Sequence, residues 1–205
     1  MAKYPPMPTA SLLANDPLVR FHAEFERARG VEPHDVTVVA LATVSAQGAP
    51  SVRYVLLKDA DARGFVFYTN RESRKGEELA ANAHAALAFL WPSIAVQVRV
   101  EGQVELVSDE ESDAYFATRP RGSQVGAWAS QQSRPLASRK TLEDAVVEYE
   151  RRFDEPGPVP RPAYWGGYRL VPSRVEFWQG RESRLHERDV YLPDGAGWRV
   201  ESIYP

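Results

Sequence analysis

Two short stretches combine basic side chains with a serine at the start of a predicted helix. They are Ser73-Arg74-Lys75 and Arg119-Pro-Arg-Gly-Ser123. Cations are unfavourable near the positive end of a helix dipole, and an anion bound to the exposed N–H groups would reverse that penalty. Gly122 would also let the backbone approach a ligand closely. Phosphate binding is one interpretation of both stretches, and side chains that extend into water are the other.

A third pair of basic residues lies inside an apolar run. Arg53 and Lys58 interrupt the predicted strand 51–59. A charge in a half-buried strand is costly unless it is paired, so this pair favours a ligand contact. Their odd spacing places them on opposite faces of a regular strand. For both side chains to contact a ligand, the strand would need a bulge, or the two residues would need separate partners.

A fourth group of basic residues alternates along a predicted strand near the C-terminus. Arg184, His186 and Arg188 occupy every second position, so they would share one strand face, with Leu185 and Glu187 on the other. Side-by-side cations repel unless an anionic or electron-rich group lies against them. A solvated face of an edge strand is the alternative interpretation.

Bulk composition excludes several kinds of chemistry. The 205-residue chain has a formal net charge of −3, so no global positive field indicates binding to nucleic acid or to an anionic membrane. It contains no cysteine, its four histidines lack metal-ligand spacing, and it has no G-x-G-x-x-G, P-loop or G-x-S-x-G motif. Difficult chemistry would therefore need an organic cofactor. Without an apolar signal-peptide core or a membrane-spanning run, a cytoplasmic protein is the default expectation.

The elements that must position these residues follow from caps, turns and periodicity. Asp16-Pro17 starts a helix that ends near Arg29, and residues 1–15, with three prolines, form an irregular N-terminal arm. Strands are predicted at 36–44, 51–59, 64–70, 84–91, 95–107, 164–172, 174–179, 184–192 and 197–203. Helices are predicted at 73–82, 108–118, 123–131 and 138–153. We expect one domain, 16–205, built as a β-barrel with helical additions and with 156–162 as a connector.

Taken together and in order, the motifs resemble those of pyridoxine/pyridoxamine 5′-phosphate oxidases. The matching segments are R53-Y-V-L-L-K58, F67-Y-T-N70, S73-R-K75, R119-P-R-G-S-Q124, G126-A-W-A-S-Q-Q-S133, F177-W-Q-G180 and R184-L-H-E-R188. The resemblance implies a mainly β fold with inserted helices (α+β), the FMN-binding split β-barrel, which is homodimeric. It also implies oxidation of pyridoxine or pyridoxamine 5′-phosphate to pyridoxal 5′-phosphate. Hydride would pass from the substrate C4′ to flavin N5, and O2 would be reduced to hydrogen peroxide.

The resemblance also implies a role for each matching residue, with both subunits contributing to one site. FMN is the implied cofactor, held by Arg53, Lys58, Tyr68, Thr69, Arg74, Lys75, Gln97, Gln132, Ser133, Trp178 and Arg188. The small phosphorylated pyridine substrate is held by Lys58, Tyr115, Arg119, Ser123, Arg184 and His186, of which Arg184 and His186 are the implied catalytic pair. No metal is expected.

Both ends of the chain depart from the family pattern. The N-terminal arm has Tyr4 but lacks an Arg-x-x-Tyr element, and the chain closes with Glu201-Ser-Ile-Tyr-Pro205 where a basic Arg-Leu-x-Pro ending is common. Two alternatives therefore stay open: a related flavin oxidase of another planar substrate, of the phenazine-biosynthesis type, and a split barrel that binds flavin or pyridoxal phosphate without turnover. Lys58, Arg119 and Ser123 favour a phosphorylated substrate. The sequence does not distinguish the pyridoxine from the pyridoxamine form.

Overall fold

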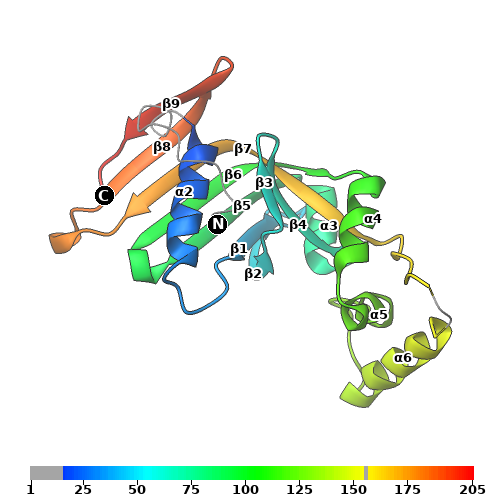
Figure 1. Ribbon diagram of the computed structural model, residues 1–205. Coiled ribbons are helices and arrows are strands. Elements are labelled where there is room, and N and C mark those ends of the chain that lie inside the picture. The colour runs from blue at the N-terminus through cyan, green and yellow to red at the C-terminus, as the bar shows by residue number, and fades with distance from the viewer. Residues whose placement is uncertain (1–15, 155–156) are drawn as a thin grey trace.

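The computed structural model describes residues 16–154 and 157–205, in which one antiparallel sheet curls into a half-barrel (Figure 1). The sheet order is β2-β1-β5-β6-β7-β4-β3, and β8 and β9 extend it from β7. The strands are β1 (Val38–Val44), β2 (Pro50–Leu56), β3 (Asp59–Asp61), β4 (Gly64–Asn70), β5 (His84–Trp91), β6 (Val96–Leu106), β7 (Trp165–Gln179), β8 (Glu187–Asp194) and β9 (Gly197–Ser202). The helices are α2 (Pro17–Arg29), α3 (Arg74–Ala81), α4 (Asp109–Thr118), α5 (Arg121–Ala129) and α6 (Arg139–Arg152), with short 3-10 turns η1 (Pro92–Ile94) and η2 (Glu182–Arg184).

The mainly β fold with inserted helices is confirmed, and so are the helix starts that caps predicted. Asp16 accepts from the backbone N–H of Leu18 at the start of α2, and Ser73 and Ser108 cap α3 and α4. Helices α3, α4, α5 and α6 gather at one end of the sheet, whereas the β8–β9 hairpin lies at the other (Figure 1). The predicted arm, residues 1–15, lies outside the described residues.

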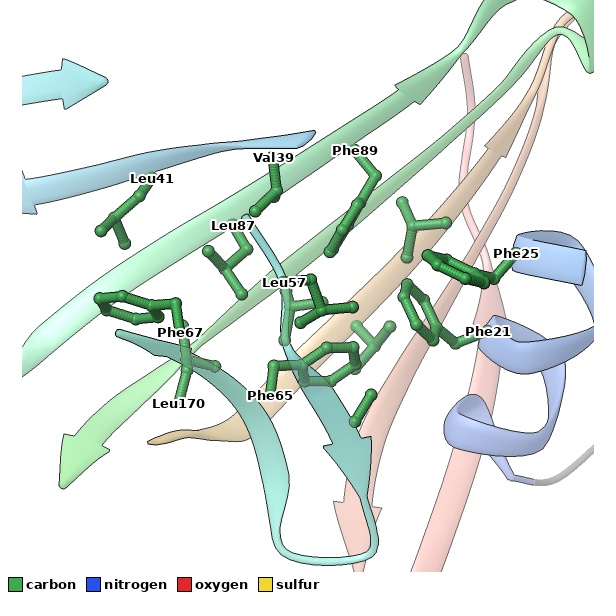
Figure 2. Close-up of a cluster of buried hydrophobic side chains, with 14 of the residues drawn as sticks. Phe21, Phe25, Val39, Leu41, Leu57, Phe65, Phe67, Leu87, Phe89 and Leu170 are labelled. Carbon is green, nitrogen blue, oxygen red and sulfur yellow. The ribbon is translucent and has the colours of Figure 1, made fainter. Parts of the chain in front are cut away.

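An aromatic core fills the concave side of the sheet, under α2. Phe21 of α2 packs edge-on against Phe65 and Phe89 (Figure 2), with ring centroids 5.0 and 5.1 Å away. Phe25 contacts Trp91. These side chains come from one helix face and two strands, β4 and β5, and all are buried. Aromatic pairs at such angles stabilise the core beyond their buried area. Helix α2 is thereby packed against β4 and β5 of the sheet that carries the candidate site.

The predicted strand 51–59 ends three residues early, at Leu56, and Lys58 therefore lies outside it. Strand β2 stops at Leu56, and the chain crosses to β3, which is at the opposite edge of the sheet. The N–H of Leu57 donates to Thr37 and that of Lys58 to Val66, at 2.8 Å each. Because Lys58 lies outside β2, strand alternation no longer places it opposite Arg53.

Strand β7 runs through the two strands predicted at 164–172 and 174–179. Its pairing with β6 shifts between Glu101 and Gly102, so Ser173 is an extra residue at a bulge next to Pro172. A bulge tolerates the missing N–H of proline, which explains why the strand continues. A Cβ on Gly102 would lie 2.0 Å from the Val171 carbonyl oxygen, so only glycine fits at this position.

The strand predicted at 184–192 is wrong at its start. Ser183 and Arg184 have φ values of 54° and 61°, which a strand does not allow, and β8 begins at Glu187. Residues 180–186 instead form the connection between β7 and β8. The pairing of these two strands ends next to it, at Gln179 with Glu187. Arg184 and His186 therefore do not share a strand face with Arg188, which alone belongs to β8.

Candidate active site

A cavity of about 850 Å³ opens at the helical end of the sheet, between β2, β4, α3, α4 and α5. It brings together most of the residues that the sequence predicted. Those on its wall are Arg53, Lys58, Tyr68, Thr69, Arg74, Lys75, Tyr115, Arg119, Ser123, Gln132 and Ser133. Sequence reasoning missed Ser51, Val52, Tyr54, Leu56 and Trp165, which line the cavity as well. Ser51 is two residues before Arg53 in β2 and therefore shares its strand face, which is the signal that could have found Ser51.

The ammonium of Lys75 lies on the cavity wall without a carboxylate partner in the part of the chain that the structure describes. Its Nζ is 3.2 Å from Thr69 Oγ1, 3.2 Å from Gln132 Oε1 and 3.3 Å from Ser73 Oγ. Burial, together with the charge of Arg53, lowers the pKa of Lys75 to about 8. A cation held only by neutral oxygens is suited to an anionic ligand.

Beside Lys75, a buried carboxylate binds two of the predicted phosphate ligands. Glu78 Oε2 accepts from Arg53 Nη2 at 3.0 Å and from Ser51 Oγ at 2.6 Å, and Oε1 accepts from Arg74 Nε at 2.9 Å. Thr43 Oγ1 donates to it too. Burial alone would raise the pKa of Glu78, but these donors outweigh it and lower the pKa to about 2. The cations of Arg53, Arg74 and Lys75 with this one anion leave two net positive charges, which match a phosphate dianion.

Glu78 was missed by the sequence analysis. Its spacing of four residues after Arg74 in α3 is a helix ion-pair signal, so that contact was predictable. The partners in β1 and β2 were not, because no local pattern places Thr43 and Ser51 beside α3. The unfavourable interaction of Arg74 with the helix dipole is therefore offset by its ion pair with Glu78. Lys75 has no such ion pair among the described residues.

Three nearly parallel aromatic rings form the wall between the two remaining cations. Tyr68 stacks on Tyr115 with centroids 4.1 Å apart and lies 5.4 Å from Trp165, at 9° to it. The guanidinium carbon of Arg119 lies 4.6 Å from the Trp165 centroid, and Lys58 Nζ lies 6.0 Å from that of Tyr115. Arg119 Nη1 is buried without a hydrogen-bond partner among the described residues. This buried, unpaired donor points to a missing acceptor.

The other predicted residues form a second cluster, at the opposite end of the sheet. Gln97 pairs with Trp178, which pairs with Arg188 across β6, β7 and β8, so the three share one face. The ring of His186 lies 4.5 Å from that of Trp178. None of these residues, nor Arg184, lines the cavity. We call these five residues the second cluster: Gln97, Trp178, Arg184, His186 and Arg188.

Beside the second cluster, the buried carboxylate of Glu176 holds one of its members, Arg188. Glu176 Oε1 accepts from Arg188 Nε at 2.7 Å and also from Arg99. Burial would raise the pKa of Glu176, but these two hydrogen bonds lower it. The backbone N–H of Arg181 donates to His186 Nδ1 at 3.2 Å, so the proton of a neutral ring lies on Nε2. His186 is thus arranged to donate a hydrogen bond outward.

Comparison with known proteins decides the family. The model of the family described as "Pyridoxamine 5'-phosphate oxidase" matches residues 25–153, and that of the "Pyridoxine 5'-phosphate oxidase C-terminal dimerisation region" matches residues 165–205. The chain belongs to the pyridoxine/pyridoxamine 5′-phosphate oxidase family. The family member of Anaeromyxobacter dehalogenans is 56% identical over 97% of this chain and 100% of its own length, and that of Myxococcus xanthus is 56% identical over 95% and 94%.

Solved structures agree on the fold. A crystal structure of PhzG from Burkholderia lata, in complex with tetrahydrophenazine-1-carboxylic acid, has a TM-score of 0.83, 31% identity, and covers 98% of this chain and 94% of its own. An FMN-binding protein of Nostoc punctiforme, related to the family, has a TM-score of 0.72 at 19% identity and covers 92% and 97%. The FMN-binding split barrel is thereby confirmed, and FMN is the cofactor of this oxidoreductase.

The residues present fit FMN on their own chemistry. Lys75 without a carboxylate, the arginines on Glu78 and the hydroxyls of Ser51 and Thr69 make a donor set suited to a phosphomonoester. The stretch matched to the dimerisation region, residues 165–205, comprises β7, β8 and β9, and this match indicates that the protein is a homodimer. In the described part of the chain, no helix has the length and apolar character needed to cross a membrane.

Proposed function

We propose that this protein oxidises pyridoxine 5′-phosphate or pyridoxamine 5′-phosphate to pyridoxal 5′-phosphate, in a site that two subunits share. The observation that carries the proposal is the pair of separate anion sites on one cavity, Lys75 with Arg53 at one side and Arg119 with Lys58 at the other. The reaction needs two phosphate sites, one for the cofactor and one for the substrate. When bound, FMN supplies the hydride acceptor for C4′ of the substrate, and O2 is the final oxidant, reduced to hydrogen peroxide.

Each side of the cavity has a proposed ligand. Arg53, Arg74, Lys75 and Ser133 bind the FMN phosphate and ribityl chain, with Tyr68, Thr69 and Gln132 along the rest of the flavin. Lys58, Tyr115, Arg119 and Ser123 bind the substrate phosphate. Arginine suits this task because its planar fork donates two parallel hydrogen bonds to phosphate oxygens.

The second cluster completes the site from the partner subunit in this proposal. Its Trp178 is thirteen residues along β7 from Trp165 on the cavity wall, roughly 40 Å at about 3.3 Å per residue, which no side chain spans. A continuous outer sheet face connects the two regions: Leu90 is paired with Gln97, and Val52, Tyr54 and Leu56 on β2 are 71%, 76% and 41% exposed. Such an apolar face is typical of an obligate interface.

Packing of two such faces would place one subunit's second cluster at the partner's cavity. Val52, Tyr54 and Leu56 belong both to this outer face and to the cavity rim, so a dimer through the face covers the cavity mouth. Arg184 and His186 would then lie over the pyridine ring, with Trp178, Gln97 and Arg188 against the flavin. The protein's contribution is to hold the substrate C4′ against the hydride acceptor and to exclude water. His186 would also donate a hydrogen bond from Nε2–H to the substrate.

The phenazine-type alternative is less well supported. The 56%-identical relatives are named pyridoxine/pyridoxamine 5′-phosphate oxidase, whereas identity to PhzG is 31%. Arg119, whose Nη1 is buried without a partner among the described residues, and Lys58, which lines the same cavity, also favour a phosphorylated substrate. A split barrel that only binds flavin would have the same fold and the same cavity as an oxidase. Only an experiment that observes turnover distinguishes the two.

Anaerobic mixing of the FMN-loaded protein with pyridoxine 5′-phosphate tests the function. We expect the flavin absorbance to bleach within the mixing experiment and to return on admission of air, with release of hydrogen peroxide. The same mixing with unphosphorylated pyridoxine is the control and should bleach far more slowly. A flavin that stays oxidised with pyridoxine 5′-phosphate and, in a parallel mixing, with pyridoxamine 5′-phosphate would refute the proposal.

A further inference from the structure

Arg119 is held in the cavity by aromatic rings alone. Its guanidinium carbon is 4.6 Å from the centroid of Trp165 and 5.3 Å from that of Phe116, and no ion pair or side-chain hydrogen bond of Arg119 is found in residues 16–154 and 157–205. Arg53 and Arg169, in contrast, are bound to carboxylates. A carboxylate would neutralise the guanidinium and occupy its donors, whereas a ring face leaves the charge and the in-plane N–H groups free.

Trp165 is itself fixed on every side. It is 6% exposed, it pairs with Asn70 at the start of β7, and its carbonyl accepts from Arg161 Nη1 at 2.6 Å. Its ring lies nearly parallel to that of Tyr68 and edge-on to that of Phe116, with centroids 5.0 Å apart. The indole is therefore a rigid platform beneath a flexible cation.

We propose that Trp165 is a positioning residue that sets the preference of this protein for a phosphorylated ligand, by holding the Arg119 guanidinium over its ring. The inference rests on the proposed function, in which Arg119 binds the substrate phosphate. Arginine side chains have many rotamers, and their ordering on binding costs affinity. If Trp165 orders the Arg119 guanidinium before the ligand binds, a phosphorylated ligand binds with a smaller entropy cost. A ligand that lacks a phosphate does not contact Arg119 in this way, so its affinity is unaffected.

Substitution of Trp165 separates the platform from the rest of the site. Trp165→Leu removes the electron-rich face, and Trp165→Phe retains a weaker one. Trp128→Leu is a matched control, because an arginine, Arg152, also lies over Trp128 at 5.8 Å but neither residue lines the cavity. The FMN-loaded variants are titrated calorimetrically with pyridoxal 5′-phosphate and with pyridoxal, which differ only in the phosphate.

We expect Trp165→Leu to weaken binding of pyridoxal 5′-phosphate by roughly tenfold and to leave pyridoxal binding unchanged, with Trp165→Phe in between and Trp128→Leu like the wild type. In turnover, KM for pyridoxine 5′-phosphate should rise by a similar factor while kcat changes little. An unchanged ratio of the two affinities in Trp165→Phe and Trp165→Leu would overturn the inference. If Trp165→Leu does not fold, the graded result of Trp165→Phe decides.

The two proposals fail in different ways. A wild-type protein that turns over pyridoxine 5′-phosphate, but whose phosphate preference is the same in the Trp165 variants, contradicts the inference alone. A wild-type protein that prefers pyridoxal 5′-phosphate, loses this preference in Trp165→Leu and never reduces its flavin contradicts the oxidase function and supports the role of Trp165.

Discussion

Trp165 and Trp178 stand at opposite ends of the same strand, β7, the first on the cavity wall and the second in the second cluster. Trp165 lines the cavity with Arg119 over its ring, and Trp178 contacts His186. At about 3.3 Å per residue, the thirteen steps from 165 to 178 span roughly 40 Å, less a small amount for the bulge. One protomer therefore cannot close a site around a small substrate with both residues.

The charge of Lys75 makes FMN binding depend on pH. Because the pKa of Lys75 is lowered to about 8 in the FMN-free protein, its ammonium is charged below that pH and neutral above it. The FMN phosphate is attracted only to the charged form and itself stays a dianion in this range. We expect FMN affinity, measured by fluorescence quenching, to fall as pH rises from about 8 to 10.

Two controls isolate this effect. Lys75→Arg keeps its charge throughout, so its FMN affinity should stay level over the same range. Riboflavin lacks the phosphate, and its binding to the wild type should be level as well. An equally steep decline for riboflavin or for Lys75→Arg would mean that another group titrates.

Glu78 connects α3 to β1 and β2, and its loss should destabilise the fold. Glu78→Gln leaves Arg53 and Arg74 without their anion, and we expect the free energy of unfolding at pH 7 to fall by about 3 kcal/mol, measured by urea unfolding of the FMN-free protein. Glu77→Gln is the neighbouring control, since its exposed pair with Arg134 should contribute under about 1 kcal/mol.

The same pair of variants gives an acid-stability prediction. The pKa of Glu78 is lowered from 4.5 to about 2 on folding, so the unfolded chain takes up the proton first as pH falls. The stability contributed by Glu78 is complete above about pH 4.5 and is lost as pH falls toward 2. The wild type should lose more stability than Glu78→Gln over this window. Parallel loss in both proteins would show that Glu78 is not the group responsible.

Arg184 is expected to act on turnover and not on the fold. It is exposed, lies in a left-handed backbone conformation, and has no ion pair or hydrogen bond from its side chain within the described ranges. Arg184→Ala should retain FMN and its melting temperature but lose about 100-fold in kcat/KM. Arg199→Ala, an exposed arginine of β9 paired with Glu201, should behave like the wild type. Unchanged kcat/KM in Arg184→Ala would remove Arg184 from the site.

Local patterns predicted the elements well, and long-range contacts were out of their reach. The caps at Asp16, Ser73 and Ser108 fixed helix starts because their hydrogen bonds involve neighbours in sequence. The crossing at Leu57 and Lys58 was not predictable, because it depends on pairing with Thr37 and Val66. Alternation also suggested a strand at Arg184, where the backbone turns.

The candidate site was predictable as a set of residues but not as an arrangement. Four basic groups stood out from charge and spacing, and the resemblance supplied their roles. Neither indicated that Glu78 holds Arg53 or that Glu176 holds Arg188, since the first contact joins α3 to β2 and the second joins β7 to β8. The roles of individual residues stay predictions until variants are measured.

Subunit complementation tests the shared site most directly. Arg119→Ala removes a cavity residue and Arg184→Ala a residue of the second cluster, so each homodimer should be nearly inactive. Mixing with subunit exchange creates heterodimers in which one site carries both changes and the other carries neither. In a statistical mixture this restores roughly a quarter of wild-type activity toward pyridoxine 5′-phosphate. Activity that stays at the level of the two parents, despite proven exchange, would contradict a site built from two subunits.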